Sequence, residues 1–403
     1  MSRRSLLRGA LALGGATTMI GSAVVSASAS SIVPATSVLV VLSLRGAADG
    51  LSLVVPHGDP AYYQARPQLA IPKANLLVAD SFFGLHPNLA PLLPLWNAGR
   101  FAAVHATGLP APNRSHFSAM EELEDADPGS SKRVGWLNRL VGTRDQHSPL
   151  QAVGVVSGPP PTELVGPVPL MTVGSVDEMR IAGDDQYDTD PAGKRRRSLE
   201  TLWGDERGAL GRAMRSTLQA TTDFEPVQST ADNSTSYGGS DLGRALSEVA
   251  RVIRGDVGVE VLTVDQGDWD MHSGLGTLQW GRMIQNAGEL ATAVAAFFSD
   301  LGTQTDKVTL VALSEFGRRV AENDSYGLDH GYGNVMLVAG AGVTGGYHCP
   351  SWPGLGTGLD ADLTVTTDYR SVLTEIVASR FGSSPASVFP GFTPESVGVM
   401  QGA

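Results

Sequence analysis

The segment VLVVLSLRGAADG, residues 38–50, determines the fold class expected for this chain. A mostly apolar run is followed by a glycine turn and then by an acid, Asp49. Apolar runs without polar alternation are typical of strands buried on both faces of a parallel sheet. In such sheets ligands bind outside the carboxyl ends of the strands, and Asp49 is expected at that rim.

Three further apolar segments lie beside short runs of acids and histidines. VEVLTV (residues 259–264) precedes DQGDWDMH, VTLVALS (residues 308–314) precedes EFGRR, and DHGYG comes just before NVMLVAG (residues 334–340). Two-metal hydrolase sites are built from carboxylates and imidazoles that lie together at one rim of a sheet. The predicted metal ligands are Asp49, Asp270, His272, Glu315 and His330.

Each of these assignments has an alternative that the sequence leaves open. Asp49 could cap the backbone of a Gly-rich turn. Glu315 could form a structural ion pair with one of the arginines that follow it, and Asp265 and Asp268 are alternative ligands. Asp329 could orient an imidazole from outside the ligand shell.

Ser115 is the candidate nucleophile. FAAVHATG (residues 101–108) is predicted to be a strand, and a Pro-rich loop leads from it into a helix that starts near Ser115. Backbone N–H groups at a helix start favour an anion, and Arg114 could contact a phosphoryl or sulfuryl oxygen. We predict catalytic roles for Ser115 and Arg114 and a structural role for His116. The alternative for Ser115 is a plain helix N-cap.

The cysteine content and the net charge of the chain limit which metals and partners it could bind. Cys349 is the only cysteine, so any metal would be held by oxygen and imidazole ligands. A divalent ion such as zinc, calcium or manganese is the expected cofactor, and a site without metal remains the alternative. The net charge of −12 argues against a nucleic-acid partner, which needs Lys and Arg against phosphate.

The N-terminus predicts export. Ser2-Arg3-Arg4-Ser5-Leu6-Leu7 is a twin-arginine pattern, and a weakly apolar run follows it up to Ala29. We predict a signal peptide over residues 1–30, cut near Ala29, and a periplasmic, cell-envelope or secreted location. The run is too polar to span a membrane. Residues 31–403 are predicted to form one α/β domain, a mostly parallel central sheet with helices on both faces, with a polar insertion or cap around residues 184–240.

The chain resembles the domain-of-unknown-function 1501 family of exported bacterial proteins, placed in the alkaline-phosphatase-like superfamily. The motifs that carry this resemblance are RGAADGL, GDPAYYQARPQLAIP, FFGLHPNLAPLLPLWNAG, NRSHFSAMEELE, GWLNRL, DWDMH, SEFGRR, DHGYG and TTDYRSVL. The superfamily has a metal-binding Asp after its first strand, a nucleophile at a helix start and later Asp and His ligands. Asp49, Ser115 and the later acids and histidines fall in that order. One departure is Phe316, where the superfamily commonly has a metal-binding histidine.

The resemblance and the residues together imply a metal-dependent phosphate- or sulfate-ester hydrolase that acts on a small anionic ester. The alternative is a catalytically degenerate protein of the same fold that binds an anionic ligand or a surface polymer. The sequence is silent on the oligomeric state.

Overall fold

The computed structural model describes residues 17–20, 23–26, 33–145, 147–156, 158–181 and 193–402. Most of the predicted signal peptide, including its expected cleavage site at Ala29, lies outside these residues. The chain divides into two compact units, and the expected mixed α/β class is confirmed in both. Unit 1 comprises Met1–Val38, Lys132–Asp232 and Glu248–Thr263, and unit 2 comprises Leu39–Ser131, Asn233–Ser247 and Val264–Ala403.

The sheet of unit 2 positions the candidate site. Its strands lie in the order β3 (Val38–Leu44), β10 (Val308–Leu313), β11 (Asn334–Gly340), β6 (Phe101–Gly108) and β12 (Gly346–His348), and β13 (Thr367–Asp368) also pairs with β6. β11 runs antiparallel to β10 and β6, whereas β12 and β13 run parallel to β6. Among β6, β10, β11, β12 and β13, only β11 runs in the opposite direction. The carboxyl ends of β10 and β6 therefore lie at the same rim of the sheet.

The apolar runs form strands close to where the sequence predicts them. β3, β10 and β11 are buried along their whole length, and β6 is buried except at its last residue. The strand predicted at residues 259–264 starts two residues later, as β9 (Val261–Gln266). Full burial explains why these strands read as continuous apolar runs.

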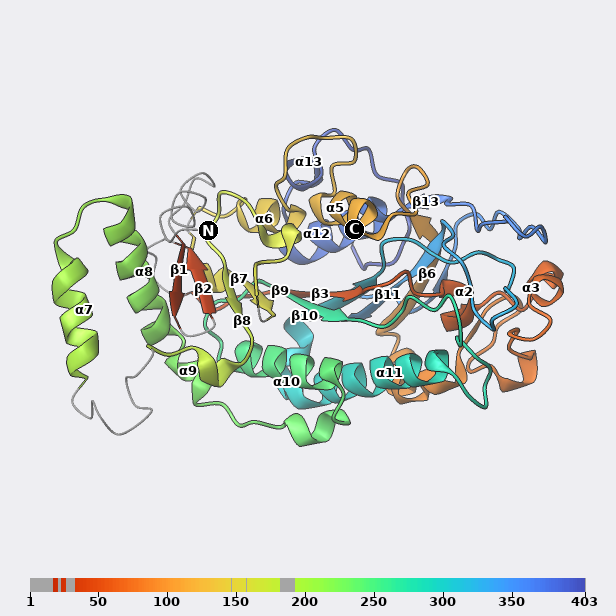
Figure 1. The fold of residues 1–403 in the computed structure, drawn as a ribbon, viewed down its shortest axis with the longest axis horizontal. Helices are drawn as coiled ribbons and strands as arrows, with labels where there is room; N and C mark the ends of the chain where they lie inside the picture. Colours follow the sequence, from red (N-terminus) through yellow and green to blue (C-terminus); the bar gives the residue numbers. More distant parts are fainter. Residues whose placement is uncertain are drawn as a thin grey trace. The chain divides into compact units, whose positions relative to one another are not determined.

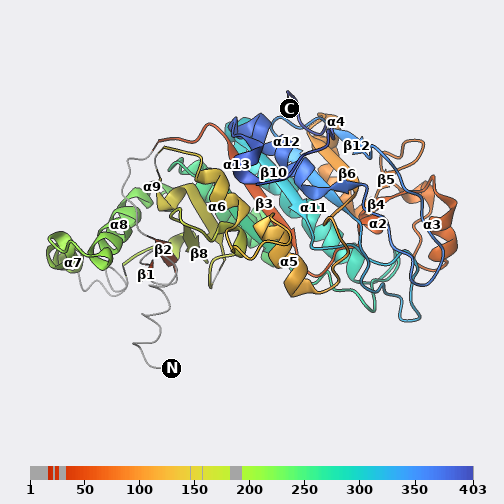
Figure 2. The same cartoon turned by 90° about the horizontal axis from the view of Figure 1, so that it is seen from above.

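Helices cover both faces of this sheet (Figures 1 and 2). α11 (Arg282–Leu301) lies on one face, and α5 (His116–Asp125) and α12 (Tyr369–Phe381) lie on the other. α11 buries apolar residues at helical spacing, including Met283, Ala287, Leu290, Val294 and Phe297. Burial of each large side chain contributes roughly 1.5–3 kcal/mol, which fixes the helix on the sheet.

The single helix expected from HPNLAPLLPLWNAG is divided in two. η2 (Pro87–Leu92) is a 3₁₀ helix and α4 (Leu93–Asn97) is an α-helix. Pro91 lies inside η2 and lacks the N–H that a continuous helix would need. The shorter elements of unit 2 are α2 (Gly50–Leu53), β4 (Val54–Val55), α3 (Pro60–Ala65), η1 (Lys73–Asn75), β5 (Gly84–Leu85), η6 (Ser234–Tyr237), η7 (Gly302–Lys307) and α13 (Pro385–Val388).

Unit 1 has its own strands and helices. β7 (Ala152–Val155) runs parallel to β8 (Met171–Val173) and to β9, and β2 (Ala23–Ser26) joins β8 and β1 (Thr17–Ile20) in antiparallel pairs. The described part of the predicted cap forms α7 (Lys194–Gly204), α8 (Ala209–Asp223) and α9 (Glu225–Gln228), and α8 lies against β1 and β2. The remaining elements are α6 (Trp136–Val141), η3 (Pro149–Gln151), η4 (Thr162–Leu164), η5 (Val176–Glu178) and α10 (Asp241–Arg254), which begins in unit 2. In the part of the chain that the structure describes, no helix is both long and apolar enough to cross a membrane.

Candidate metal centre

Four segments of unit 2 meet beyond the ends of its strands. α5 begins at His116, shortly after β6 ends. The loop after β9 carries Asp270 and His272, the loop after β10 carries Glu315, and the loop before β11 carries His330. These residues are up to 214 positions apart, yet their side chains are in contact.

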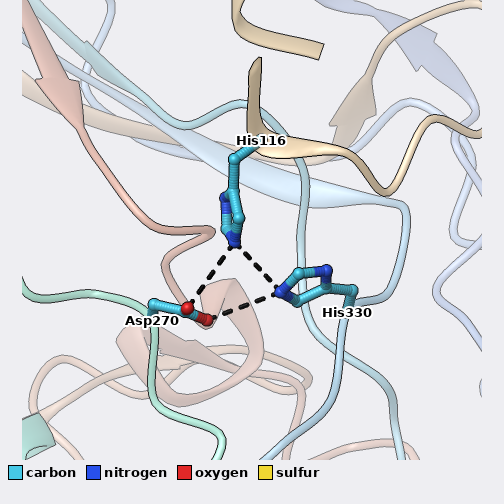
Figure 3. Close-up of side chains that lie close together, drawn as sticks. All are labelled: His116, Asp270 and His330. Carbon is cyan, nitrogen blue, oxygen red and sulfur yellow. Dashed lines mark hydrogen bonds and ion pairs between the residues drawn. The ribbon is translucent and has the colours of Figure 1, made fainter. Parts of the chain in front are cut away.

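Imidazole nitrogens and one carboxylate converge at this point (Figure 3). His330 Nε2 lies 3.0 Å from His116 Nε2 and 2.9 Å from His272 Nε2. Oxygens of Asp270 lie 3.7 Å from His116 Nε2, 3.3 Å from His272 Nε2 and 3.5 Å from His330 Nε2. We call His116, Asp270, His272 and His330 the histidine cluster.

The other ring nitrogen of each histidine has an oxygen partner. His116 Nδ1 lies 2.7 Å from Glu315 Oε1, and His272 Nδ1 lies 2.8 Å from Asp329 Oδ1. His330 Nδ1 lies 3.0 Å from the carbonyl oxygen of Arg114. Because these oxygens accept hydrogen bonds, the Nδ1 atoms carry the protons and the Nε2 lone pairs face one another. Metal-binding histidines almost always have such partners.

The spacing of the ligand atoms would allow a cation to bind among them. Three lone pairs and a carboxylate repel each other at these distances unless a positive charge lies between them. Ligands about 2.0–2.1 Å from a tetrahedral zinc ion lie about 3.3–3.4 Å from one another. The separations of His330 Nε2 from the other two Nε2 atoms, and of Asp270 oxygens from all three, lie between 2.9 and 3.7 Å, on either side of that value. In the described residues, His116, Asp270 and His330 also form a group whose ligand atoms all lie within 4.8 Å of one another.

Arg318 holds Asp270 in place. Its buried guanidinium donates to Asp270 Oδ1 at 2.6 Å and to the carbonyl oxygens of Gly46, Ala47, Trp269 and Leu328. Burial alone would raise the pKa of Asp270, but the hydrogen bond and charge of Arg318 lower it below the usual value. Asp270 is therefore ionised at neutral pH.

The same environment keeps His330 in its metal-binding form. Desolvation lowers the pKa of His330, and the charge of Arg318 and the neighbouring imidazoles lower it further, against the hydrogen bond to Arg114. The hydrogen bond from His272 lowers the pKa of Asp329. Neutral imidazoles and ionised carboxylates are the forms that bind metals.

Glu315 orients His116 from a rigid position. Its side chain is 1% exposed and accepts hydrogen bonds from Ser314 Oγ at 2.8 Å and from the backbone N–H of Gly46 at 2.9 Å. Gly46 has φ +109°, and a Cβ at this position would lie 2.5 Å from the backbone nitrogen of Asp270. Only glycine fits this close approach.

Phe316 forms an apolar wall of the cluster. It is buried, and its ring centroid lies 5.0 Å from those of both His116 and His330. A phenyl ring cannot bind a metal, but these contacts limit the orientations of the two imidazoles. The departure seen in the sequence is therefore compatible with a mononuclear site.

Asp49 is held by a different partner. Its carboxylate oxygens accept hydrogen bonds from the two terminal nitrogens of Arg66, at 2.6 and 3.0 Å. Arg66 also donates to Val320 O, Ser52 Oγ and Arg319 O. Burial would raise the pKa of Asp49, but Arg66 lowers it overall. Asp49 and Arg66 form a buried ion pair, and the structure does not bring Asp49 into the histidine cluster.

Ser115 and Arg114 lie directly before His116. Ser115 is the exposed N-cap residue of α5, and its side chain makes no capping hydrogen bond. The guanidinium of Arg114 pairs with Asp362, which also binds Arg319. The Ser115 hydroxyl is thus accessible, whereas the Arg114 side chain is paired with an acid in this structure.

The sequence prediction and the structure overlap in part. The structure brings Asp270, His272 and His330 together, and Glu315 contacts the cluster through His116. The sequence predicts a structural role for His116, although it follows the buried strand β6, and a position after a buried strand is the signal that selected the other candidates. Asp329 orients His272 rather than the adjacent His330. Three other histidines contact backbone groups instead: His86, His105 and His348.

Comparison with known proteins yields one family. No curated protein matches the chain. Residues 95–376 match the family described as "Protein of unknown function (DUF1501)". This range includes every residue of the histidine cluster, together with Ser115, Glu315 and Asp329. Because the match covers more than half of the sequence, the chain belongs to the DUF1501 family.

Proposed function

We propose that the protein is a metal-dependent hydrolase of phosphate or sulfate esters. In this proposal His116, Asp270 and His330 hold one divalent cation, and His272 is a fourth ligand or faces an open position. A bound cation would polarise an ester oxygen as a Lewis acid. The observation that carries the proposal is the convergence of three oriented Nε2 atoms on one carboxylate.

The ligand chemistry narrows the choice of metal. Calcium prefers a shell of six to eight oxygens. Imidazole ligands suit zinc and other transition ions better. We therefore favour zinc over calcium and keep manganese as the second choice. Apart from any metal, the cluster and its partners contain three carboxylates and one guanidinium. The carboxylates belong to Asp270, Glu315 and Asp329, and the guanidinium belongs to Arg318. This excess of negative charge favours the binding of a cation.

Ser115 is the nucleophile in this proposal. Its hydroxyl is exposed and free of a capping bond, and the next residue is the ligand His116. In a phosphomonoester the serine oxygen would form a bond to phosphorus while the bond to the leaving alcohol breaks and the serine proton passes to that alcohol. Water would then cleave the phosphoserine, which releases phosphate and restores Ser115. Arg114 would have to leave Asp362 to contact the transferred group.

The fold and the route of export belong to the same proposal. An alkaline-phosphatase-like fold accounts for a metal site at the carboxyl ends of strands in an α/β sheet. The twin-arginine pattern supports export of the folded protein. Cleavage near Ala29 would remove β1 and β2 from unit 1.

Elemental analysis and an ester assay test this function. We expect the purified full-length protein to contain about one equivalent of zinc or manganese. It should hydrolyse p-nitrophenyl phosphate or p-nitrophenyl sulfate, and chelation should remove this activity. Ser115→Ala should keep the metal and lose the activity. Stoichiometric metal without hydrolysis of either ester would instead favour the degenerate, anion-binding alternative, and absence of metal would contradict the proposal.

The carboxylate behind His272 should set the metal affinity. Asp329→Asn replaces an anionic acceptor with a neutral amide, so His272 loses basicity and orientation. Loss of such an outer partner weakens metal binding by about 10–100-fold. A competition titration with a chelator measures the change, with Asp324→Asn, an exposed acid on the same loop, as the matched control. Equal affinities in the two variants would show that Asp329 has no such role.

A further inference from the structure

Two exposed aromatic side chains lie on the loops that hold the histidine cluster. Trp280 is 46% exposed and Tyr326 is 39% exposed, and they are among the few large apolar side chains at the surface of the described chain. Their ring centroids are 5.4 Å apart with an interplanar angle of 67°. We call Trp280 and Tyr326 the aromatic pair.

Backbone contacts tie the aromatic pair to the cluster. Asn323 Nδ2 donates to the carbonyl oxygen of His272 at 2.9 Å, and Gly274 N donates to Ser325 O at 3.0 Å. A Cβ on Gly327 would lie 2.2 Å from the carbonyl oxygen of His272, so the residue after Tyr326 touches the backbone of His272. The segment that delivers Asp329 and His330 therefore touches the backbone of His272 immediately after Tyr326.

The backbone that presents Tyr326 is unusual. Tyr326 has φ +53°, in the left-handed region that non-glycine residues rarely adopt. Such conformations persist where the surroundings fix them, and they cluster at ligand sites. Here Gly276 N donates to Tyr326 O at 3.3 Å, and Thr277 N donates to Trp280 O at 2.8 Å. The hydrogen bonds hold both loops while leaving the two rings at the surface.

We propose that the aromatic pair binds the organic group of the ester, and that this group carries a flat ring. This inference rests on the proposed function, because the ester head would lie at the metal. Aromatic rings gain binding energy from stacking against planar or apolar ring faces. A half-exposed tryptophan on the loop that also carries Asp270 and His272 would favour such a group, and a short aliphatic ester would leave it in water.

Nonhydrolysable phosphonates test the inference without catalysis. The full-length protein, loaded with the ion that elemental analysis identifies, is titrated with phenylphosphonate and methylphosphonate by calorimetry. We expect phenylphosphonate to bind about tenfold more tightly, the range expected for stacking of one ring. Trp280→Ala should bring the ratio close to one and leave the affinity for methylphosphonate unchanged.

Conservative and remote variants complete the design. Trp280→Phe and Tyr326→Phe keep a ring and should keep most of the preference, and Leu202→Ala, an exposed apolar residue of unit 1, should keep all of it. Equal binding of both phosphonates to the wild type, or a preference that survives Trp280→Ala, would overturn the ring site alone. Failure of both phosphonates to bind the metal-loaded protein would overturn the proposed function with it.

Discussion

His330→Ala is expected to remove the metal from the purified protein. His330 Nε2 lies within 3.0 Å of the two other imidazoles, so its loss opens the middle of the cluster. Removal of a direct ligand should weaken binding by more than about 100-fold, beyond the effect of losing an outer partner. Elemental analysis after dialysis should show less than about a tenth of the wild-type metal, and any esterase activity should fall by the same factor.

His348→Ala is the matched control for this variant. His348 is a histidine of the same unit whose Nε2 contacts the carbonyl oxygen of Thr344, away from the described cluster. It should retain the wild-type metal content. Full metal occupancy in His330→Ala would exclude the proposed centre, provided that circular dichroism shows both variants to be folded.

Asp49→Asn is expected to destabilise the protein without changing its metal content. The change leaves Arg66, which is fully buried, without an anionic partner. Breaking a buried ion pair in this way typically costs about 3–5 kcal/mol in the free energy of unfolding. Urea unfolding measures the loss, and elemental analysis of the same sample measures the metal.

This variant distinguishes the two roles considered for Asp49. If Asp49 is a ligand, as the sequence suggested, metal content should fall together with stability. If it acts only through Arg66, stability alone should fall. Asp306→Asn provides a control, because its pair with Arg100 is largely exposed and surface ion pairs contribute little.

The strands were predictable because a strand that is buried on both faces has a continuous run of apolar residues. β3, β10 and β11 are continuous apolar runs, and the sequence places each of them closely. The direction of β11 was not predictable, since burial on both faces produces the same composition in parallel and antiparallel strands. The break between η2 and α4 was missed because apolar spacing outweighed the signal of Pro91.

The sequence indicates which acids and histidines lie near the candidate site, but not which side chain each of them contacts. Asp270, Glu315 and Asp49 were all chosen because each follows a buried strand. That criterion predicts which rim of the sheet a residue lies on, but not which side chain it contacts. Which carboxylate faces an imidazole and which faces a guanidinium depends on side chains far apart in the sequence. Arg66 forms an ion pair with Asp49, and Arg318 forms one with Asp270. Among the described residues Glu315 has no arginine partner of this kind and instead contacts His116.

Both units are assembled from separate stretches of chain, and this affects how the protein can be made. Unit 1 is incomplete until Thr263 has been synthesised, and unit 2 continues to Ala403. At about 5–20 residues per second, roughly 15–50 s pass between the synthesis of Ser131 and that of Ala403. For most of that interval the apolar strands β3 and β6 exist without β10 and β11, whose last residues are Leu313 and Gly340. During that time the nascent chain exposes apolar surface of the kind that chaperones protect, and His330, the last histidine of the cluster, is made only after β10.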